Sequence, residues 1–118
     1  MDLEKANIAR DARLRNRILR LLNDSRPFVI HGNQIVDATD GFNGDDIEDD
    51  AHALRLLGDL ANLGMIATAD RRTHRSQELV PGLLDCTVTA KGSRFVMGGE
   101  PAEVMIKDGR IVRKVGSG

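Results

Sequence analysis

Apolar and polar residues alternate along the first part of the chain with the period of an amphipathic helix. Apolar side chains recur at spacings of three and four, with arginines between them, which is typical of a helix that turns one face toward a core. The pattern predicts a helix that begins at Asp2 or Lys5 and ends at Asn23, before Pro27. Its predicted core positions are Ile8, Ala12, Leu14, Ile18, Leu21 and Leu22.

The segment after this helix combines a short apolar run with turn-forming residues. Residues 28–30 predict either a short strand or the entry to a second helix. Asn33 is a suitable N-cap for a short helix over residues 34–39. Residues 40–44 contain two glycines, which adopt positive φ without strain, and therefore predict a turn. We expect Phe42 to anchor this turn in the core.

A third helix is predicted to begin at Asp45 and to end at Gly64. The spacing of Asp45 and Glu48 resembles a capping box, in which two side chains satisfy orphan backbone amides, and Gly64 suits a left-handed C-cap. The apolar stripe is Ile47, Ala51, Leu54, Leu57, Leu60 and Ala61. The outer face that this stripe leaves is Glu48, Asp49, His52, Arg55, Asp59 and Asn62.

The next part of the chain predicts a hairpin followed by a helix. Two strands are expected, over residues 65–69 and 83–88. The loop between them, residues 70–82, is long and rich in arginine. Thr89 is placed to cap a short helix over residues 90–97.

The end of the chain predicts a second hairpin. Asp108 and Gly109 favour a type I′ turn and separate the apolar residues 104–106 from residues 111–112. An isolated two-stranded hairpin is marginally stable in water, so we expect it to pack on the domain or to pair with a partner chain.

Length and charge limit the domain organisation and the partners. We expect one domain over residues 1–98, and a C-terminal hairpin with a frayed tail over residues 99–118. The formal charge of -1 supplies no bulk attraction to nucleic acid or anionic membrane. The charges are uneven, however: residues 1–26 hold seven Lys and Arg against four acids, residues 37–59 hold eight acids against one base, and residues 70–94 hold five bases against three acids.

Composition excludes several classes of protein. One cysteine excludes an internal disulfide, and no segment has the length of a membrane span or the layout of a signal peptide, so we expect a cytoplasmic protein. Cys86 alternates with Leu84 and Val88, which predicts a buried core thiol. The absence of Trp and Tyr argues against single-strand binding by base stacking.

The chain shows no motif for metal binding or catalysis. Asp37 and Glu48 are spaced like the ends of a twelve-residue calcium loop, but Thr39, Gly41 and Phe42 occupy its ligand and glycine positions. The histidines and the cysteine lack paired zinc-ligand spacing. No glycine-rich phosphate loop follows a strand, and no nucleophile stands beside a base. We therefore expect no cofactor, no metal and no enzymatic activity.

Two phrases of the sequence, LRLLGDLANLGMI and TVTAKGSRFV, carry a resemblance that covers roughly residues 14–97. On them the chain resembles winged-helix regulators of the MarR, ArsR and PadR type, and in size and layout it looks like small winged-helix proteins of Mu-like prophages. The resemblance implies an α+β, mainly α fold: a winged helix-turn-helix with a β-hairpin wing, followed here by the C-terminal hairpin. The matching positions are Leu60, Leu63, Gly64, Met65 and Ile66 at the end of the recognition helix, and Val88, Thr89 and Gly92 at the end of the wing.

The function implied by this resemblance is transcription regulation. A bacterial or prophage regulator of this type would bind duplex DNA as a homodimer on a two-fold site, mainly through its basic wing. The resemblance assigns base contacts to His52 and Arg55, and phosphate contacts in the wing to Arg71, Arg72, His74 and Arg75.

Five carboxylates at the start of the presumed recognition helix oppose DNA binding, because they would face the phosphates. They are Asp45, Asp46, Glu48, Asp49 and Asp50. One or two would stabilise the helix dipole, whereas five predict a further role. The alternative function is a protein–protein interaction module, a phage or host adaptor that binds a basic partner and no DNA. Pairing of these carboxylates with the arginines of the first helix is a structural explanation of the acidic segment. A purely scaffolding domain is a third class of function.

Overall fold

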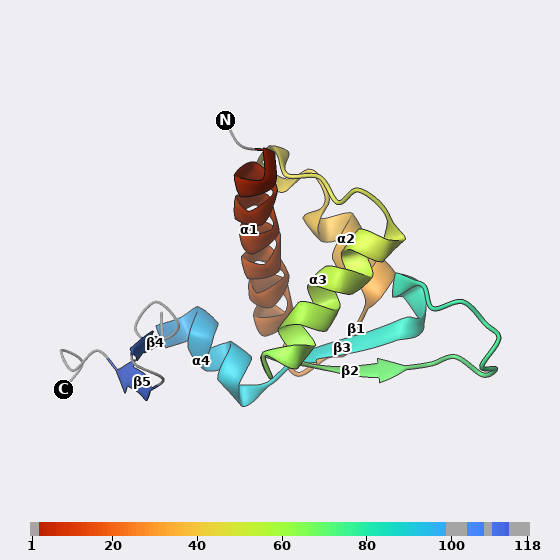
Figure 1. Ribbon diagram of the computed structural model, residues 1–118. Helices are drawn as coiled ribbons and strands as arrows, with labels where there is room; N and C mark the ends of the chain where they lie inside the picture. The colour runs from red at the N-terminus through yellow and green to blue at the C-terminus, as the bar shows by residue number, and fades with distance from the viewer. Residues whose placement is uncertain (1–2, 99–103, 108–109, 114–118) are drawn as a thin grey trace.

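The computed structural model describes residues 3–98, and the backbone of two further strands over residues 104–107 and 110–113. The fold is α+β and mainly helical, with four helices and a three-stranded antiparallel sheet in the described residues (Figure 1). In chain order the elements are α1 (Leu3–Asp24), β1 (Ile30–His31), α2 (Gly32–Thr39), α3 (Asp50–Asn62), β2 (Ile66–Asp70), β3 (Leu84–Val88), α4 (Ala90–Gly98), β4 (Val104–Lys107) and β5 (Arg110–Arg113), with short 3-10 turns at Phe42–Gly44 and Pro81–Leu83.

The sheet places β3 in its centre. Its strand order is β1-β3-β2, and both pairings are antiparallel. The short strand β1 pairs Ile30 with Cys86, and β2 pairs Ile66 with Val88. β2 and β3 thus form the predicted hairpin, while the apolar run after α1 supplies a third strand.

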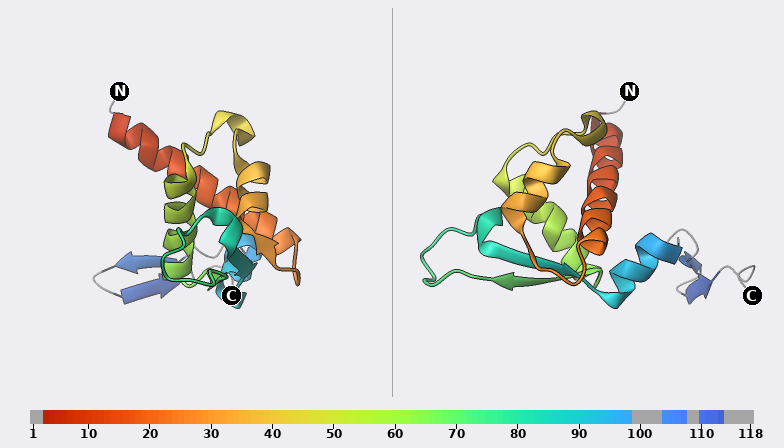
Figure 2. Two further views of the ribbon diagram at one scale, coloured as in Figure 1. Left: turned by 90° about the vertical axis from the view of Figure 1, so that its right-hand side faces the viewer. Right: turned by 180° about the vertical axis from the view of Figure 1, so that it is seen from behind.

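Helices α1, α2 and α3 stand on one face of this sheet (Figure 2). The core lies between the helices and that face, and it consists mostly of leucine and isoleucine with the thiol of Cys86. Cys86 is fully buried, as predicted, and burial raises its pKa to about 11. The buried apolar residues are Leu14, Ile18, Leu19, Leu22, Ile35, Leu56, Leu57, Leu60, Met65, Ile66, Leu84 and Cys86.

Two predicted helix caps are confirmed, one at the end of α3 and one at the start of α4. Gly64 adopts a φ of 75°, and the amide of Met65 donates to the carbonyl of Leu60 at 3.0 Å, the long bond of a Schellman C-cap. The hydroxyl of Thr89 accepts from the amide of Gly92 at 3.1 Å and so caps α4. The bounds of α1 also agree with the prediction, although Ile8 is exposed rather than part of the core.

The prediction that the third helix begins at Asp45 is wrong. Asp49 is the N-cap, with an extended backbone and a side chain that accepts from the amide of His52, so α3 begins at Asp50. The preceding residues form a loop in which the Asp40 carboxylate accepts from the amide of Ile47 at 2.8 Å. This long-range bond holds the chain extended where the sequence predicted the first helical turn.

The buried face of α3 also differs from the predicted apolar stripe. Ala53 and Leu56 enter the core, whereas Ala51, which was predicted in the apolar stripe, is exposed. His52, predicted on the outer face, is only 3% exposed. The buried face of α3 is thus rotated relative to the predicted stripe. It packs against both α1 and the sheet, and not only through a single line of leucines.

Two smaller predictions are also wrong. Phe42 is 44% exposed and stacks on the guanidinium of Arg17, 3.9 Å from the ring centre, instead of entering the core. The N-cap of α2 is His31 rather than Asn33, because the helix starts directly at the end of β1. The turn itself is as expected, with positive φ at Gly41 and Gly44.

The C-terminal hairpin is present in the backbone, where β4 and β5 pair antiparallel from Val104 with Arg113 to Lys107 with Arg110. The predicted Asp108–Gly109 turn and the frayed tail lie outside the described residues. Among the helices that the structure describes, none is both long enough and apolar enough to cross a membrane.

Candidate functional site

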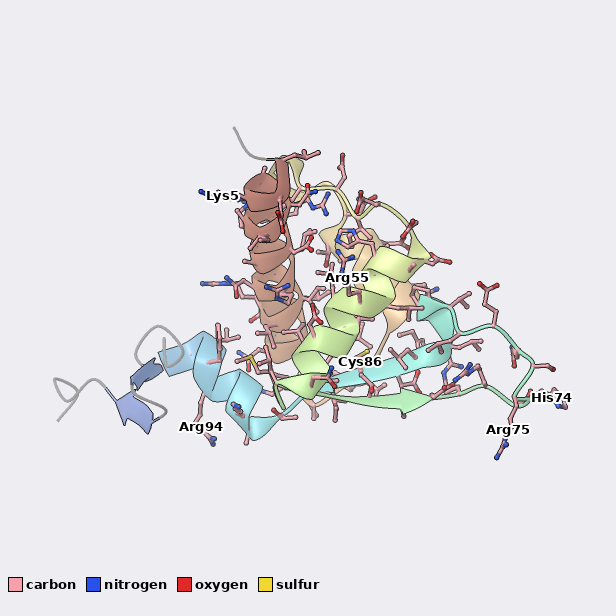
Figure 3. All side chains as sticks on the ribbon, viewed as in Figure 1. Lys5, Arg55, His74, Arg75, Cys86 and Arg94 are labelled. Carbon is pink, nitrogen blue, oxygen red and sulfur yellow. The ribbon has the colours of Figure 1, made fainter. Side chains whose placement is uncertain are left out.

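The loop between β2 and β3 extends away from the body of the protein. We call residues 71–80 the arginine loop; residues 71–78 are all exposed. His74 and Arg75 lie at its far end and point away from the helices (Figure 3). Within the described residues, neither side chain makes an ion pair or hydrogen bond. The loop therefore presents one arginine and one histidine to solvent.

Arg71, a predicted phosphate contact, is held at the base of the loop. Its Nε donates to Oδ1 of Asp85 at 2.8 Å, and its terminal nitrogen donates to the carbonyl of Gly82. Nδ1 of His31 lies 2.6 Å from the same Asp85 oxygen. Asp85 on β3 thus ties β1 to the loop.

Arg72 is also engaged within the loop. Its guanidinium pairs with the carboxylate of Asp70 at 2.6 Å and 2.9 Å, and it reaches the carbonyl of Gln77 at 3.4 Å. The hydrogen bonds from Arg72 lower the pKa of Asp70. Of the four predicted loop residues, two therefore shape the loop and two remain available.

His52, a predicted base contact, does not lie on the outer face of α3 as predicted. Its ring is buried, and Nδ1 accepts from the backbone amide of Glu48 at 3.0 Å. That nitrogen consequently carries no proton, and Nε2 donates to Oδ1 of Asp11 at 2.8 Å. His52 therefore connects α1 to the loop that precedes α3.

Asp11 on α1 is the centre of this network. Arg55 donates to its Oδ2 at 2.9 Å, and Arg10 donates to its Oδ1 at 3.1 Å. Burial raises the pKa of this carboxyl, but the hydrogen bonds from His52, Arg10 and Arg55 outweigh burial and hold the pKa of Asp11 below its ordinary value. Arg55 remains exposed on α3 while one of its nitrogens is bound (Figure 3).

The five carboxylates do not share one environment. Asp45 receives two hydrogen bonds of 2.8 Å from Arg13, which lower its pKa, and Glu48 pairs with Arg10 at 3.3 Å. Asp49 is the helix cap. In the described part of the chain, Asp46 and Asp50 have no ion-pair partner. Arginines of the first helix thus pair with two of the five carboxylates, Asp45 and Glu48.

The outward face of α3 is nearly neutral. Helical geometry, given its buried residues, turns a stripe of mostly small and uncharged side chains to solvent. The only charged member is Arg55. This neutral stripe is Ala51, Arg55, Gly58 and Asn62, and Leu54 beside it is partly buried against the core. Glu48 and Asp49, predicted on this face, precede the helix, and Asp59 pairs with Arg15 of α1 at 3.5 Å.

Sequence analysis missed Asp11 as a functional position. It is the one acid between Ala6 and Asn23, a stretch that contains five arginines. That isolation was the available signal, but its partners His52 and Arg55 are more than forty residues away. Their proximity depends on tertiary packing of α1 against α3.

Comparison with known proteins adds no further constraint. No family model, curated protein or solved structure gives a significant match to the chain. The described residues contain no group of three His, Cys, Asp or Glu side chains arranged to hold a metal ion. The site must therefore be interpreted from its own geometry.

Proposed function

We propose that the chain is a winged-helix protein that binds duplex DNA, with the arginine loop as its wing. The observation that carries this proposal is the element order α1-β1-α2-α3-β2-β3 with the sheet order β1-β3-β2. In a winged helix this order leaves one face of the third helix and the hairpin loop beside each other for DNA. The exposed, unpaired Arg75 at the tip supports the same assignment.

The five carboxylates within residues 45–50 oppose DNA binding less strongly in the structure than the sequence indicated. Two of the five carboxylates are paired with arginines of α1, and all of them except Asp50 precede α3. The neutral stripe neither attracts nor repels phosphate strongly. Small residues such as Gly58 and Ala51 also allow close approach of the helix to a groove.

Each available side chain has a role in this proposal. Arg75 and His74 would contact phosphates through the wing, and Arg55 at the edge of the neutral stripe would approach base edges. Arg71 and Arg72 would position the wing rather than bind DNA directly. The class of protein proposed is a transcription regulator that acts as a homodimer on a two-fold site.

A salt-dependent DNA titration tests this proposal. Random-sequence duplex should shift the NMR signals of the wing at about 50 mM salt and do so far less at about 200 mM, because counterion release drives binding. Arg75→Ala should weaken binding and reduce the salt slope by about one phosphate contact. Lys5→Ala is the matched control, since it removes the same charge from an exposed site on α1, remote from the wing (Figure 3). Equal affinities of wild type and Arg75→Ala would contradict the assignment of the wing.

A second candidate function rests on the two unpaired acids. Asp46 and Asp50 flank the cap of α3, are exposed and have no cation within ion-pair distance in the described chain. A basic protein partner would neutralise them. Binding of a lysine-rich peptide that is lost in Asp46→Asn/Asp50→Asn, without any response to duplex DNA, would favour this function over the first.

A further inference from the structure

A groove runs between α1 and the 3-10 turn Phe42–Gly44, on a part of the surface that neither proposed function uses. Its volume is about 410 Å³, within the range of small-molecule sites. Its lining side chains are Arg13, Leu14, Asn16, Arg17, Arg20, Phe42, Asn43 and Asp45. Three arginines therefore face one carboxylate.

The one carboxylate does not neutralise the groove. Asp45 is occupied by two hydrogen bonds from Arg13. Among the described residues, no carboxylate lies within ion-pair distance of Arg17 or Arg20. The positive charges of these two guanidiniums thus have no counter-charge within ion-pair distance in the described structure. The two residues follow the paired Arg13 by four and seven positions along α1.

Arg17 is the more unusual of the two. Its Nε is buried and has no hydrogen-bond partner in the described structure, an arrangement that costs free energy when no counter-charge compensates it. The guanidinium is fixed in place because it lies over the ring of Phe42, at 3.9 Å. The structure therefore holds a partly desolvated cation rigidly at the wall of a groove.

We infer that this groove binds a small ligand through a phosphate group, held by Arg17 and Arg20. A phosphate monoester carries close to two negative charges at neutral pH, which matches two unpaired guanidiniums better than a single carboxylate would. Asn16 and Asn43 supply neutral amide donors in the same lining. The inference is independent of DNA binding, because none of these residues belongs to the arginine loop or the neutral stripe.

The test is an NMR titration that follows the side-chain Nε–Hε signals of the arginines. The buried Nε of Arg17 is protected from solvent, so its signal should be sharp. Inorganic phosphate and adenosine monophosphate, at constant ionic strength with chloride, should shift Arg17 and Arg20 with saturation by about 10 mM if the Kd is about 1 mM or lower. Adenosine without phosphate should cause no shift. A stronger response to the nucleotide than to phosphate would identify a nucleotide phosphate as the preferred source.

Matched variants separate this site from the wing. Arg20→Gln, at an exposed position that should not disturb folding, should weaken phosphate binding about tenfold and leave DNA binding unchanged. Arg17→Gln should do the same, and Arg75→Gln should weaken DNA binding while it keeps phosphate binding. Shifts that chloride or adenosine reproduces would overturn the inference. It would also be overturned if duplex DNA shifted Arg17 and Arg20 while phosphate and the nucleotide did not.

Discussion

The protein uses arginine differently in α1 and in the arginine loop. On α1, Arg10, Arg13 and Arg15 pair with carboxylates from α3 and the segment before it. In the arginine loop, Arg71 and Arg72 pair with carboxylates of the hairpin itself, and the tip is left without partners. The first set joins elements that are distant in sequence, whereas the second set only shapes a local hairpin.

This difference separates the charged side chains that stabilise the fold from those that are available for binding. Pairs that bridge α1 and α3 surround Asp11, whose side chain is 14% exposed, so their loss leaves a buried donor without a partner. The loop pairs are partly exposed to solvent, and solvent-exposed pairs contribute little to stability. Stability should therefore respond mainly to the α1 network, and binding mainly to the loop.

The largest effect is expected for Asp11→Ala. The change leaves Nε2–H of buried His52 and one donor of Arg55 without an acceptor, and an unsatisfied buried donor costs about 1–3 kcal/mol. We expect the free energy of unfolding, measured by urea denaturation, to fall by about 2 kcal/mol.

The matched control is Asp24→Ala, which removes a carboxylate from the exposed C-terminal end of the same helix. It should change the stability by less than about 0.5 kcal/mol. If the two variants unfold at the same urea concentration, the network around Asp11 does not connect α1 to α3 energetically.

The contribution of Asp11 should also depend on pH. Its folded-state pKa is lowered, so its stabilisation is complete above the unfolded carboxyl pKa of about 4 and is lost as the pH falls through the lower folded-state value. Asp11→Asn should therefore be less stable than wild type at about pH 6. The difference should shrink as the pH falls through the lowered folded-state pKa of Asp11, because the wild-type carboxyl is then protonated. Urea midpoints over this pH range check this, and a difference that grows toward acid pH would contradict the sign.

The sequence predicted features that depend on local signals and missed those that depend on distant partners. The periodicity of α1, the Gly64 cap and the Thr89 cap each lie within a few residues. The start of α3 was misplaced because Asp45 and Asp49 both suit an N-cap. Contacts with residues outside the helix, from Arg13 to Asp45 and from the amide of Ile47 to Asp40, accompany the later start at the Asp49 cap.

The candidate site divides in the same way. Arg75 and His74 were predicted from composition, since a cluster of basic residues in a long loop is exposed whatever the tertiary fold. His52 was predicted on the outer face from the helical periodicity of α3. This periodicity carries no information about a carboxylate that lies on another helix. Its burial requires Asp11 of α1 to accept from its ring.

A smaller effect on stability is expected at the base of the arginine loop. Asp85→Asn weakens the contacts to His31 and Arg71, both largely exposed, and should cost about 0.5–1 kcal/mol. The effect should be local: the amide of Arg71, which donates to the carbonyl of Leu83 at 2.8 Å, should exchange with solvent faster. Amide exchange in α3 should stay at the wild-type rate, and faster exchange there would show that the hairpin and the helices unfold together.

A stability change of similar size and opposite sign is expected in the neutral stripe. A Cβ at Gly58 would meet no atom within 4 Å, and alanine stabilises a helix interior relative to glycine by about 0.5–1 kcal/mol. Gly58→Ala should therefore raise the urea midpoint slightly.

Gly58→Glu then tests whether this face of α3 approaches DNA. Because a Cβ at this position meets no atom within 4 Å, the protein should fold, but the added carboxylate would face the phosphates and weaken DNA binding several-fold in the titration described for Arg75→Ala. If Gly58→Glu binds DNA like the wild type while Arg75→Ala does not, the arginine loop alone contacts DNA. The neutral stripe would then have no part in DNA binding.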